Sequence, residues 1–191
     1  YRLSEDLDFL ISTPSGAAIS VRRKGMAPVR EWVKKISEEI GILTLPEDFN
    51  GHNSSRQYIA YVTYPSIFLS EEAARIKIEV GLRETTLTPP VHLKARTLLL
   101  SPFTRKPLVP DIEVVTLSMQ EAIAEKLRAA LTRLEPAIRD FFDIDYLASR
   151  NKIDLDDQHL FQLLAEKLKV PGNPPIDLSL ARKVKLKTQI N

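Results

Sequence analysis

The stretch of sequence that decides the expected fold is Leu3-Ser4-Glu5-Asp6-Leu7-Asp8-Phe9. Its mixture of apolar and acidic residues predicts a β-strand, in which alternate side chains point to opposite faces. Asp6 and Asp8 would then project together on one side, with Ser4 beside them. Leu7 and Phe9 would project on the other side, toward a hydrophobic core.

Two carboxylates held side by side on a strand repel each other unless a positive charge lies between them. Carboxylate oxygens are hard ligands, and they suit Mg²⁺ or Mn²⁺. Asp6 and Asp8 are therefore candidate metal ligands. The alternative for two aspartates alone is an exposed strand end solvated by water.

The composition is typical of a globular protein, with 43% hydrophobic and 27% charged residues among 191. The net charge of +2 excludes a general polycation, so any contact with nucleic acid would come from a local patch. Without cysteine the chain can form neither disulfides nor cysteine-ligated zinc sites. No apolar run approaches the ~20 residues of a membrane helix, and we expect a cytoplasmic protein. Because the sequence starts with Tyr1, we expect that native residues precede it.

The first half of the sequence predicts one helix and two further strands. Apolar spacing predicts a helix over residues 28–40, with Trp32 in its buried stripe. Alternation predicts neighbouring strands at 58–64 and 75–84. Glu79 lies on the second of these strands, on the face opposite its apolar row. It is either a third carboxylate of the site or the partner of Lys77 or Arg83 in a surface charge cluster.

The second half of the sequence predicts mainly helices. Ser118 and Glu121 form a capping box, which predicts a helix start at residue 118. A second helix is predicted over 137–149, and a third follows a cap region at 154–157. A linker over 171–175 and a solvated basic tail complete the sequence. Lys126 and Arg133 share a helix face with small residues, which leaves room for a bulky anion. We predict a catalytic domain over residues 1–116 and a helical region over 117–191.

Four segments occur in the order found in a known family. They are Leu3-Ser4-Glu5-Asp6-Leu7-Asp8-Phe9, Lys77-Ile78-Glu79-Val80, Ala124-Glu125-Lys126-Leu127-Arg128-Ala129 and Arg139-Asp140-Phe141-Phe142-Asp143. In these segments the chain resembles the AbiEii/AbiGii-type nucleotidyltransferase toxins of the DNA-polymerase-β-like superfamily. The resemblance implies an α+β nucleotidyltransferase fold, in which a small mixed sheet with flanking helices is followed by a helical C-terminal part.

The resemblance also implies roles for individual residues. Asp6, Asp8 and Glu79 would hold Mg²⁺ or Mn²⁺, and Lys126 would contact the phosphates of a nucleotide. We predict that Ser4, Lys77, Lys126 and Arg133 together form the nucleotide-binding set.

The fourth segment supplies Asp140 as a further catalytic residue. Arg139 and Asp143 are also spaced as a helix-surface ion pair, which is the alternative for this segment. Some family members carry a lysine where this chain has Arg139, and arginine would not replace a proton-transferring lysine. The family's small glycine motif, expected shortly before the Asp6–Asp8 strand, does not occur in this sequence.

The resemblance implies an enzyme that moves a nucleotidyl group from a nucleoside triphosphate to an acceptor hydroxyl. The acceptor would be RNA, such as the 3′ end of a tRNA, with a protein acceptor left open. The protein would be the toxin of a toxin–antitoxin or phage-defence pair, with a cognate antitoxin. A catalytically silent module of the same fold, binding a nucleotide or a partner protein, is the alternative.

Overall fold

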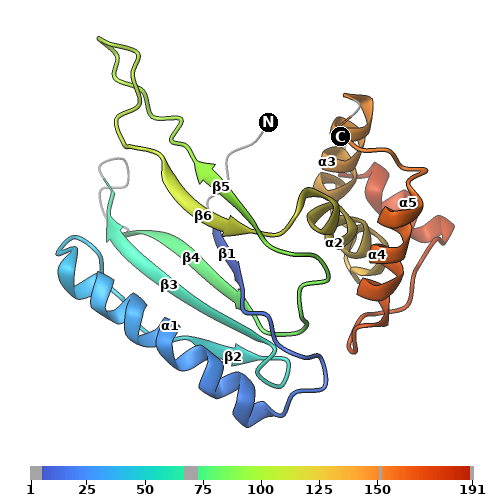
Figure 1. Ribbon diagram of the computed structural model, residues 1–191, viewed down its shortest axis with the longest axis horizontal. Coiled ribbons are helices and arrows are strands. Elements are labelled where there is room, and N and C mark those ends of the chain that lie inside the picture. Colours follow the sequence, from blue (N-terminus) through green and yellow to red (C-terminus); the bar gives the residue numbers. More distant parts are fainter. Residues whose placement is uncertain (1–5, 67–72, 151, 190–191) are drawn as a thin grey trace. The chain divides into compact units, whose positions relative to one another are not determined.

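The computed structural model describes residues 6–66, 73–150 and 152–189. The chain divides into two compact units, Tyr1–Thr85 and Thr86–Asn191. The elements of the first unit are β1 (Asp6–Leu10), α1 (Ile19–Glu39), β2 (Asn50–His52), β3 (Gln57–Pro65) and β4 (Ala73–Gly81). Those of the second are β5 (Val91–Ala95), β6 (Ile112–Thr116), α2 (Met119–Thr132), α3 (Ile138–Ser149), α4 (Gln158–Lys169) and α5 (Leu180–Lys187). This mixture of small sheets and helices confirms the α+β class (Figure 1).

The first unit is built on a mixed sheet with the strand order β1-β4-β3-β2. β1 runs parallel to β4, whereas β4 and β3, and β3 and β2, are antiparallel. The two strands predicted as neighbours, β3 and β4, are confirmed as a pair. The parallel pairing sets Asp6 opposite Lys77 and Asp8 opposite Glu79.

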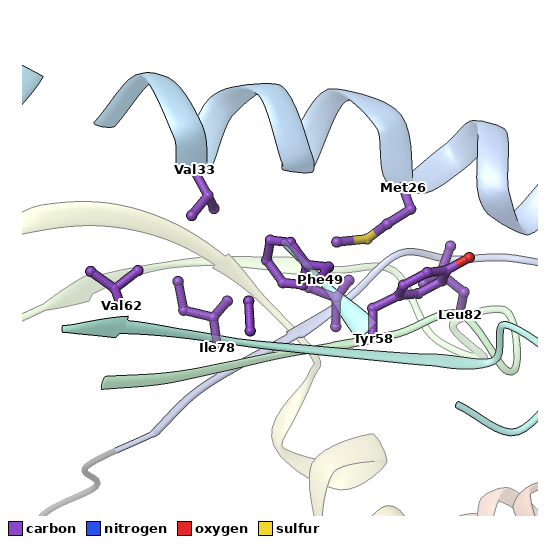
Figure 2. Packing of buried hydrophobic residues seen from close by; sticks show 9 residues of the cluster. Met26, Val33, Phe49, Tyr58, Val62, Ile78 and Leu82 are labelled. Carbon is purple, nitrogen blue, oxygen red and sulfur yellow. The ribbon is translucent and has the colours of Figure 1, made fainter. Parts of the chain in front are cut away.

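Helix α1 covers one face of this sheet, and the core lies between them (Figure 2). Val33 points from α1 toward Ile78 of β4, Met26 points from α1 toward Phe49, and Met26 and Leu82 are fully buried. Full burial of such a side chain contributes roughly 1.5–3 kcal/mol, so this layer fixes which sheet face is apolar. The opposite face of β4 then carries the polar residues Lys77 and Glu79.

The start predicted for α1 is wrong, because the helix begins at Ile19 and Pro28 lies inside it. The early turns were missed because their inward-facing residue is Arg22, which does not extend an apolar stripe. Arg22 is 3% exposed, and its guanidinium donates to the carbonyl oxygens of Leu82 (3.2 Å) and Ser15 (2.8 Å).

Trp32 was predicted to be buried, and this is wrong, since the residue is 55% exposed. At 100° per residue, Val33 lies about 20° from Met26 around the helix, whereas Trp32 lies about 120° away. The buried stripe of α1 therefore runs through Met26 and Val33, and Trp32 lies outside it.

Leu7 and Phe9 stand in register with the buried Ile78 and Val80, and so lie on the apolar side of the sheet. Each nevertheless keeps 47% of its surface exposed. In the described part of the chain β1 is an edge strand, which leaves one flank of these side chains uncovered. Their predicted burial is therefore only partial.

In the second unit β5 and β6 form an antiparallel pair, with residues 96–111 between them. Its helical core joins α2 to α4 through five buried residues, Ile123, Ala124, Leu160, Leu163 and Leu164. The two compact units meet at residue 85 of the sequence, so β5 and β6 belong to the second of them, and the predicted domain boundary at residue 116 stays a prediction. The catalytic role assigned to residues 1–116 stays a prediction.

The basic tail forms helix α5, in which Lys183, Lys185 and Lys187 are exposed, as the predicted solvated tail requires, and only Arg182 is buried. Arg182 is 6% exposed and donates to the carbonyl oxygens of Ala130 (2.5 Å) and Arg133 (2.6 Å). These carbonyls belong to the last turn of α2 and the residue that ends it, where helical hydrogen bonding runs out. None of the helices in the described residues is long and apolar enough to cross a membrane.

Ser118 caps α2, as predicted, by accepting a hydrogen bond from Glu121 N–H at 3.2 Å. We expect Ser118→Ala to lower the free energy of unfolding by about 1 kcal/mol, because that N–H loses its partner at the helix start. Urea unfolding followed by circular dichroism measures the change. The matched control is Ser37→Ala, at a half-buried position inside α1 that caps no helix, and an equal loss in both variants would contradict the capping role.

Candidate active site

The polar face of the β1–β4 pair gathers the predicted acidic residues. Asp6 and Asp8 of β1 align with Lys77 and Glu79 of β4, and alternation directs all four away from the core formed by Ile78 and its neighbours. We call these four residues the acidic face. Its three carboxylates and one ammonium leave a net negative charge, in a sheet whose other face is buried.

Hydrogen bonds from two neighbouring strand residues hold Glu79 in place. Lys77 Nζ donates to one carboxylate oxygen at 2.6 Å, and Gln57 Nε2, from β3, donates to the other at 2.5 Å. The side chains of Lys77 and Glu79 are each 28% exposed, so this ion pair is partly shielded from water. The pairing of Glu79 with Lys77 that the sequence left open is therefore present, whereas Arg83 lies near Glu84, with 3.8 Å between Nε and Oε1.

The acidic face acts electrostatically on Lys77. The hydrogen bond to Glu79 raises the pKa of Lys77 above its ordinary value of 10.5, burial opposes the rise, and the charges of Glu79, Asp6 and Asp8 add to it. Lys77 is therefore protonated at neutral pH and serves as a positive charge among three carboxylates.

A divalent cation is the group that the family implies at this face. Asp6, Asp8 and Glu79 supply the hard oxygen donors that Mg²⁺ and Mn²⁺ prefer, and the strand register places them on one surface. Among the described residues, no three acidic or histidine side chains are gathered closely enough to hold a metal ion as they stand. The residue types fit a metal, and the coordination by these three residues stays a prediction.

The second unit pairs its two candidate cations with acidic side chains of α3. Lys126 Nζ lies 2.7 Å from Asp143 Oδ2, and Arg133 Nε lies 3.2 Å from Asp140 Oδ2. The sequence predicted that Arg133 lies within α2. In the structure it is the residue that ends α2 and lies outside the helix. Arg139 is exposed. Both carboxylates of the fourth segment therefore position cations predicted to bind phosphate.

Asp140 is 3% exposed, on the first turn of α3. Within the described part of the chain its buried Oδ2 has no hydrogen-bond partner, so its ion pair with Arg133 lacks hydrogen-bond geometry. A buried carboxylate with one oxygen in this state is costly in an ordinary helix. The catalytic role of Asp140 and the alternative, an ion pair of Arg139 with Asp143, both stay open.

Two residues mark the limits of the sequence prediction. Ser4, predicted to contact the nucleotide, lies outside the described residues. Gln57 was not singled out, although it fixes the orientation of Glu79. The one available signal was its position, since a polar residue opens an otherwise apolar strand beside β4. The catalytic and nucleotide-binding roles of Asp6, Asp8, Glu79, Lys77, Lys126, Arg133 and Asp140 stay predictions.

A mixed sheet with an acidic face, followed by helices that carry paired cations, is what the resemblance to nucleotidyltransferases led us to expect. The chain belongs to the AbiEii family, described as the nucleotidyl transferase AbiEii toxin of a type IV toxin–antitoxin system, whose profile matches residues 1–190. This membership confirms the resemblance drawn from the four sequence segments. No curated protein sequence matches the chain significantly.

Among solved structures, the chain is similar to MenT4, a nucleotidyltransferase toxin from Mycobacterium tuberculosis. The two are 16% identical, and the TM-score is 0.48. The match covers 85% of this chain and 48% of the other, so the chain spans about half the length of that protein.

Proposed function

We propose that this protein is a metal-dependent nucleotidyltransferase, which moves a nucleoside monophosphate from a nucleoside triphosphate to an acceptor hydroxyl. The observation that carries the proposal is the acidic face, where parallel pairing of β1 and β4 aligns Asp8 with Glu79 and sets Asp6 alongside. Membership of the AbiEii family supports the same activity.

In the proposed reaction, the acceptor oxygen forms a bond to the α-phosphorus of the triphosphate. The bond from that phosphorus to the β-bridging oxygen breaks, pyrophosphate leaves, and the acceptor proton passes to solvent or to a carboxylate of the acidic face. A divalent cation at Asp6, Asp8 and Glu79 would supply Lewis-acid stabilisation of the phosphate charge.

The remaining residues bind and orient. Lys126 and Arg133 would stabilise negative charge on the phosphates, where preorganised cations are most effective. Their acidic partners Asp143 and Asp140 hold these cations in place before the substrate arrives. Side chains that are already held in place need less reorganisation in the transition state. The two ion pairs would therefore support both the binding and the orientation of the phosphates.

We further propose that the acceptor is RNA, in particular a tRNA 3′ end, and that the protein is the toxin of a pair with a cognate antitoxin. The family description as a type IV toxin supports the antitoxin. The 3′ hydroxyl of an RNA supplies the nucleophile that the reaction needs.

The test is to incubate the full-length protein with total RNA and each α-phosphate-labelled triphosphate in turn, with Mg²⁺ or with a chelator. We expect label in one RNA size class from one preferred triphosphate, and its loss in the chelator. Label in protein would overturn the RNA acceptor and keep the transferase. Triphosphate binding without any transfer would overturn the enzyme and support the silent binding module.

A further inference from the structure

Lys77 lies among the three carboxylates that are proposed to hold a metal ion. It stands opposite Asp6 in the β1–β4 register, and its Nζ is 2.6 Å from Glu79 Oε2. The charges of Asp6 and Asp8 also act on it. Its ammonium therefore serves the three carboxylates as a counter-cation within the protein itself.

The two oxygens of Glu79 are both engaged by protein groups. Oε2 accepts from Lys77, and Oε1 accepts from Gln57 at 2.5 Å. A divalent cation bound to Oε2 at about 2.0–2.2 Å would lie beside the ammonium, and these like charges repel strongly in a partly shielded site. For Glu79 to become a metal ligand, Lys77 must leave its carboxylate.

We propose that Lys77 and a divalent cation compete for Glu79, so that metal binding releases the Lys77 ammonium toward the incoming triphosphate. This inference rests on the proposed function, because it takes Glu79 as a metal ligand. It assigns Lys77 two successive partners. The first is the Glu79 carboxylate before the metal binds, and the second is a phosphate of the nucleotide afterwards.

The exchange has a physical advantage. Three carboxylates on one sheet face repel one another, and Lys77 offsets this repulsion while no metal is bound. When the metal takes over that task, the same lysine needs a new anion. The binding of a triphosphate supplies one, and the release of Lys77 thus couples metal binding to nucleotide binding.

The test measures Mn²⁺ binding to the full-length protein without nucleotide, by the electron paramagnetic resonance of free Mn²⁺. We expect Lys77→Met to bind Mn²⁺ at least about tenfold more tightly than the parent, since a competing cation has been removed. Lys77→Arg retains a cation and should keep the weaker binding of the parent. The matched control is Lys35→Met, whose lysine forms an exposed ion pair with Glu39 on α1, and its Mn²⁺ affinity should not change.

A second measurement separates exchange from a simple change of charge. With saturating Mn²⁺, Lys77→Met should bind the triphosphate more weakly than the parent by at least about fivefold. Without Mn²⁺ the two proteins should bind it equally, because Lys77 is then held by Glu79, whereas a simple change of charge would weaken binding in both conditions. Equal Mn²⁺ affinity in Lys77→Met and the parent, or unchanged triphosphate affinity, would overturn the exchange and leave the metal site intact. If neither the parent nor Lys77→Met binds Mn²⁺, the proposed metal site itself falls, and the exchange with it.

Discussion

Asp8→Asn should lower the rate of nucleotidyl transfer by at least about 100-fold, with little change in the unfolding temperature. The amide side chain would keep the shape of the aspartate and lose its charge. The variant would lose a ligand of the proposed cation, which would stabilise the phosphate charge. As a scale, removing one hydrogen-bond donor from an oxyanion hole costs about 2.7–4 kcal/mol. The fold should tolerate the change, because removing one of three neighbouring carboxylates reduces repulsion on the acidic face.

The rate is measured by label transfer at saturating Mg²⁺ and triphosphate, and folding by thermal melting. The matched control is Asp156→Asn, which removes the same charge from an exposed position before α4 and should keep the parental rate. A normal rate in Asp8→Asn would remove the acidic face from the catalytic proposal. A lower melting temperature in step with the rate would make Asp8 a structural residue.

Lys167→Met should lower the free energy of unfolding by about 3–5 kcal/mol, which is the cost of breaking one side of a buried ion pair. Lys167 is 1% and Glu121 0% exposed, and their charged groups are 2.7 Å apart. The substitution leaves the Glu121 carboxylate buried, with only the N–H groups of Leu87 and Thr88 and the Thr88 hydroxyl to stabilise it. Glu121 therefore acts as the link between α2, α4 and the segment before β5, and does not complete the capping box by returning to Ser118.

The measurement is urea unfolding at pH 7, and the control lies on the same helix. Lys169 forms an ion pair with Glu166 at 2.6 Å, but their side chains are 70% and 53% exposed. Lys169→Met should therefore cost less than about 1 kcal/mol, since exposed pairs contribute little. Similar losses in Lys167→Met and Lys169→Met would show that burial does not decide the strength of these pairs.

The Glu121 pair also has a pH signature. Burial raises the pKa of Glu121, but the hydrogen bonds from Lys167, Leu87 and Thr88 outweigh it and hold that pKa below the ordinary value of 4.5. The stabilisation is therefore complete above pH 4.5 and is lost as the pH falls through the folded-state pKa. The contribution of Glu121 to the free energy of unfolding should therefore decline only below pH 4.5, which urea unfolding at a series of pH values measures.

Much of the site was predictable, because strand periodicity alone determines which side chains share a face. The alternation at Asp6 and Asp8, and separately at Glu79, predicted three carboxylates opposite an apolar row. The parallel register that aligns Asp8 with Glu79 agrees with this. Helix α2 was likewise predicted from Ser118, whose cap is a local contact.

The rest could not be predicted, because it depends on contacts between distant parts of the chain. The burial of Arg22 requires the carbonyl of Leu82, and that of Arg182 requires the free carbonyls at the end of α2. The bond from Gln57 to Glu79 requires the register of β3. Polar side chains that find such partners are invisible to hydrophobic periodicity, and the start of α1 and the existence of α5 were missed for this reason.

The parallel pairing of β1 with β4 has a consequence for synthesis. The two strands lie near opposite ends of the first unit's sequence, with α1 and the β2–β3 hairpin between them. Pairings between distant segments form late, because a long loop must close first. A ribosome that has translated the two aspartates has therefore made a chain in which the acidic face is still incomplete. The activity that we propose for this face would then arise only after β4 has left the exit tunnel and folded.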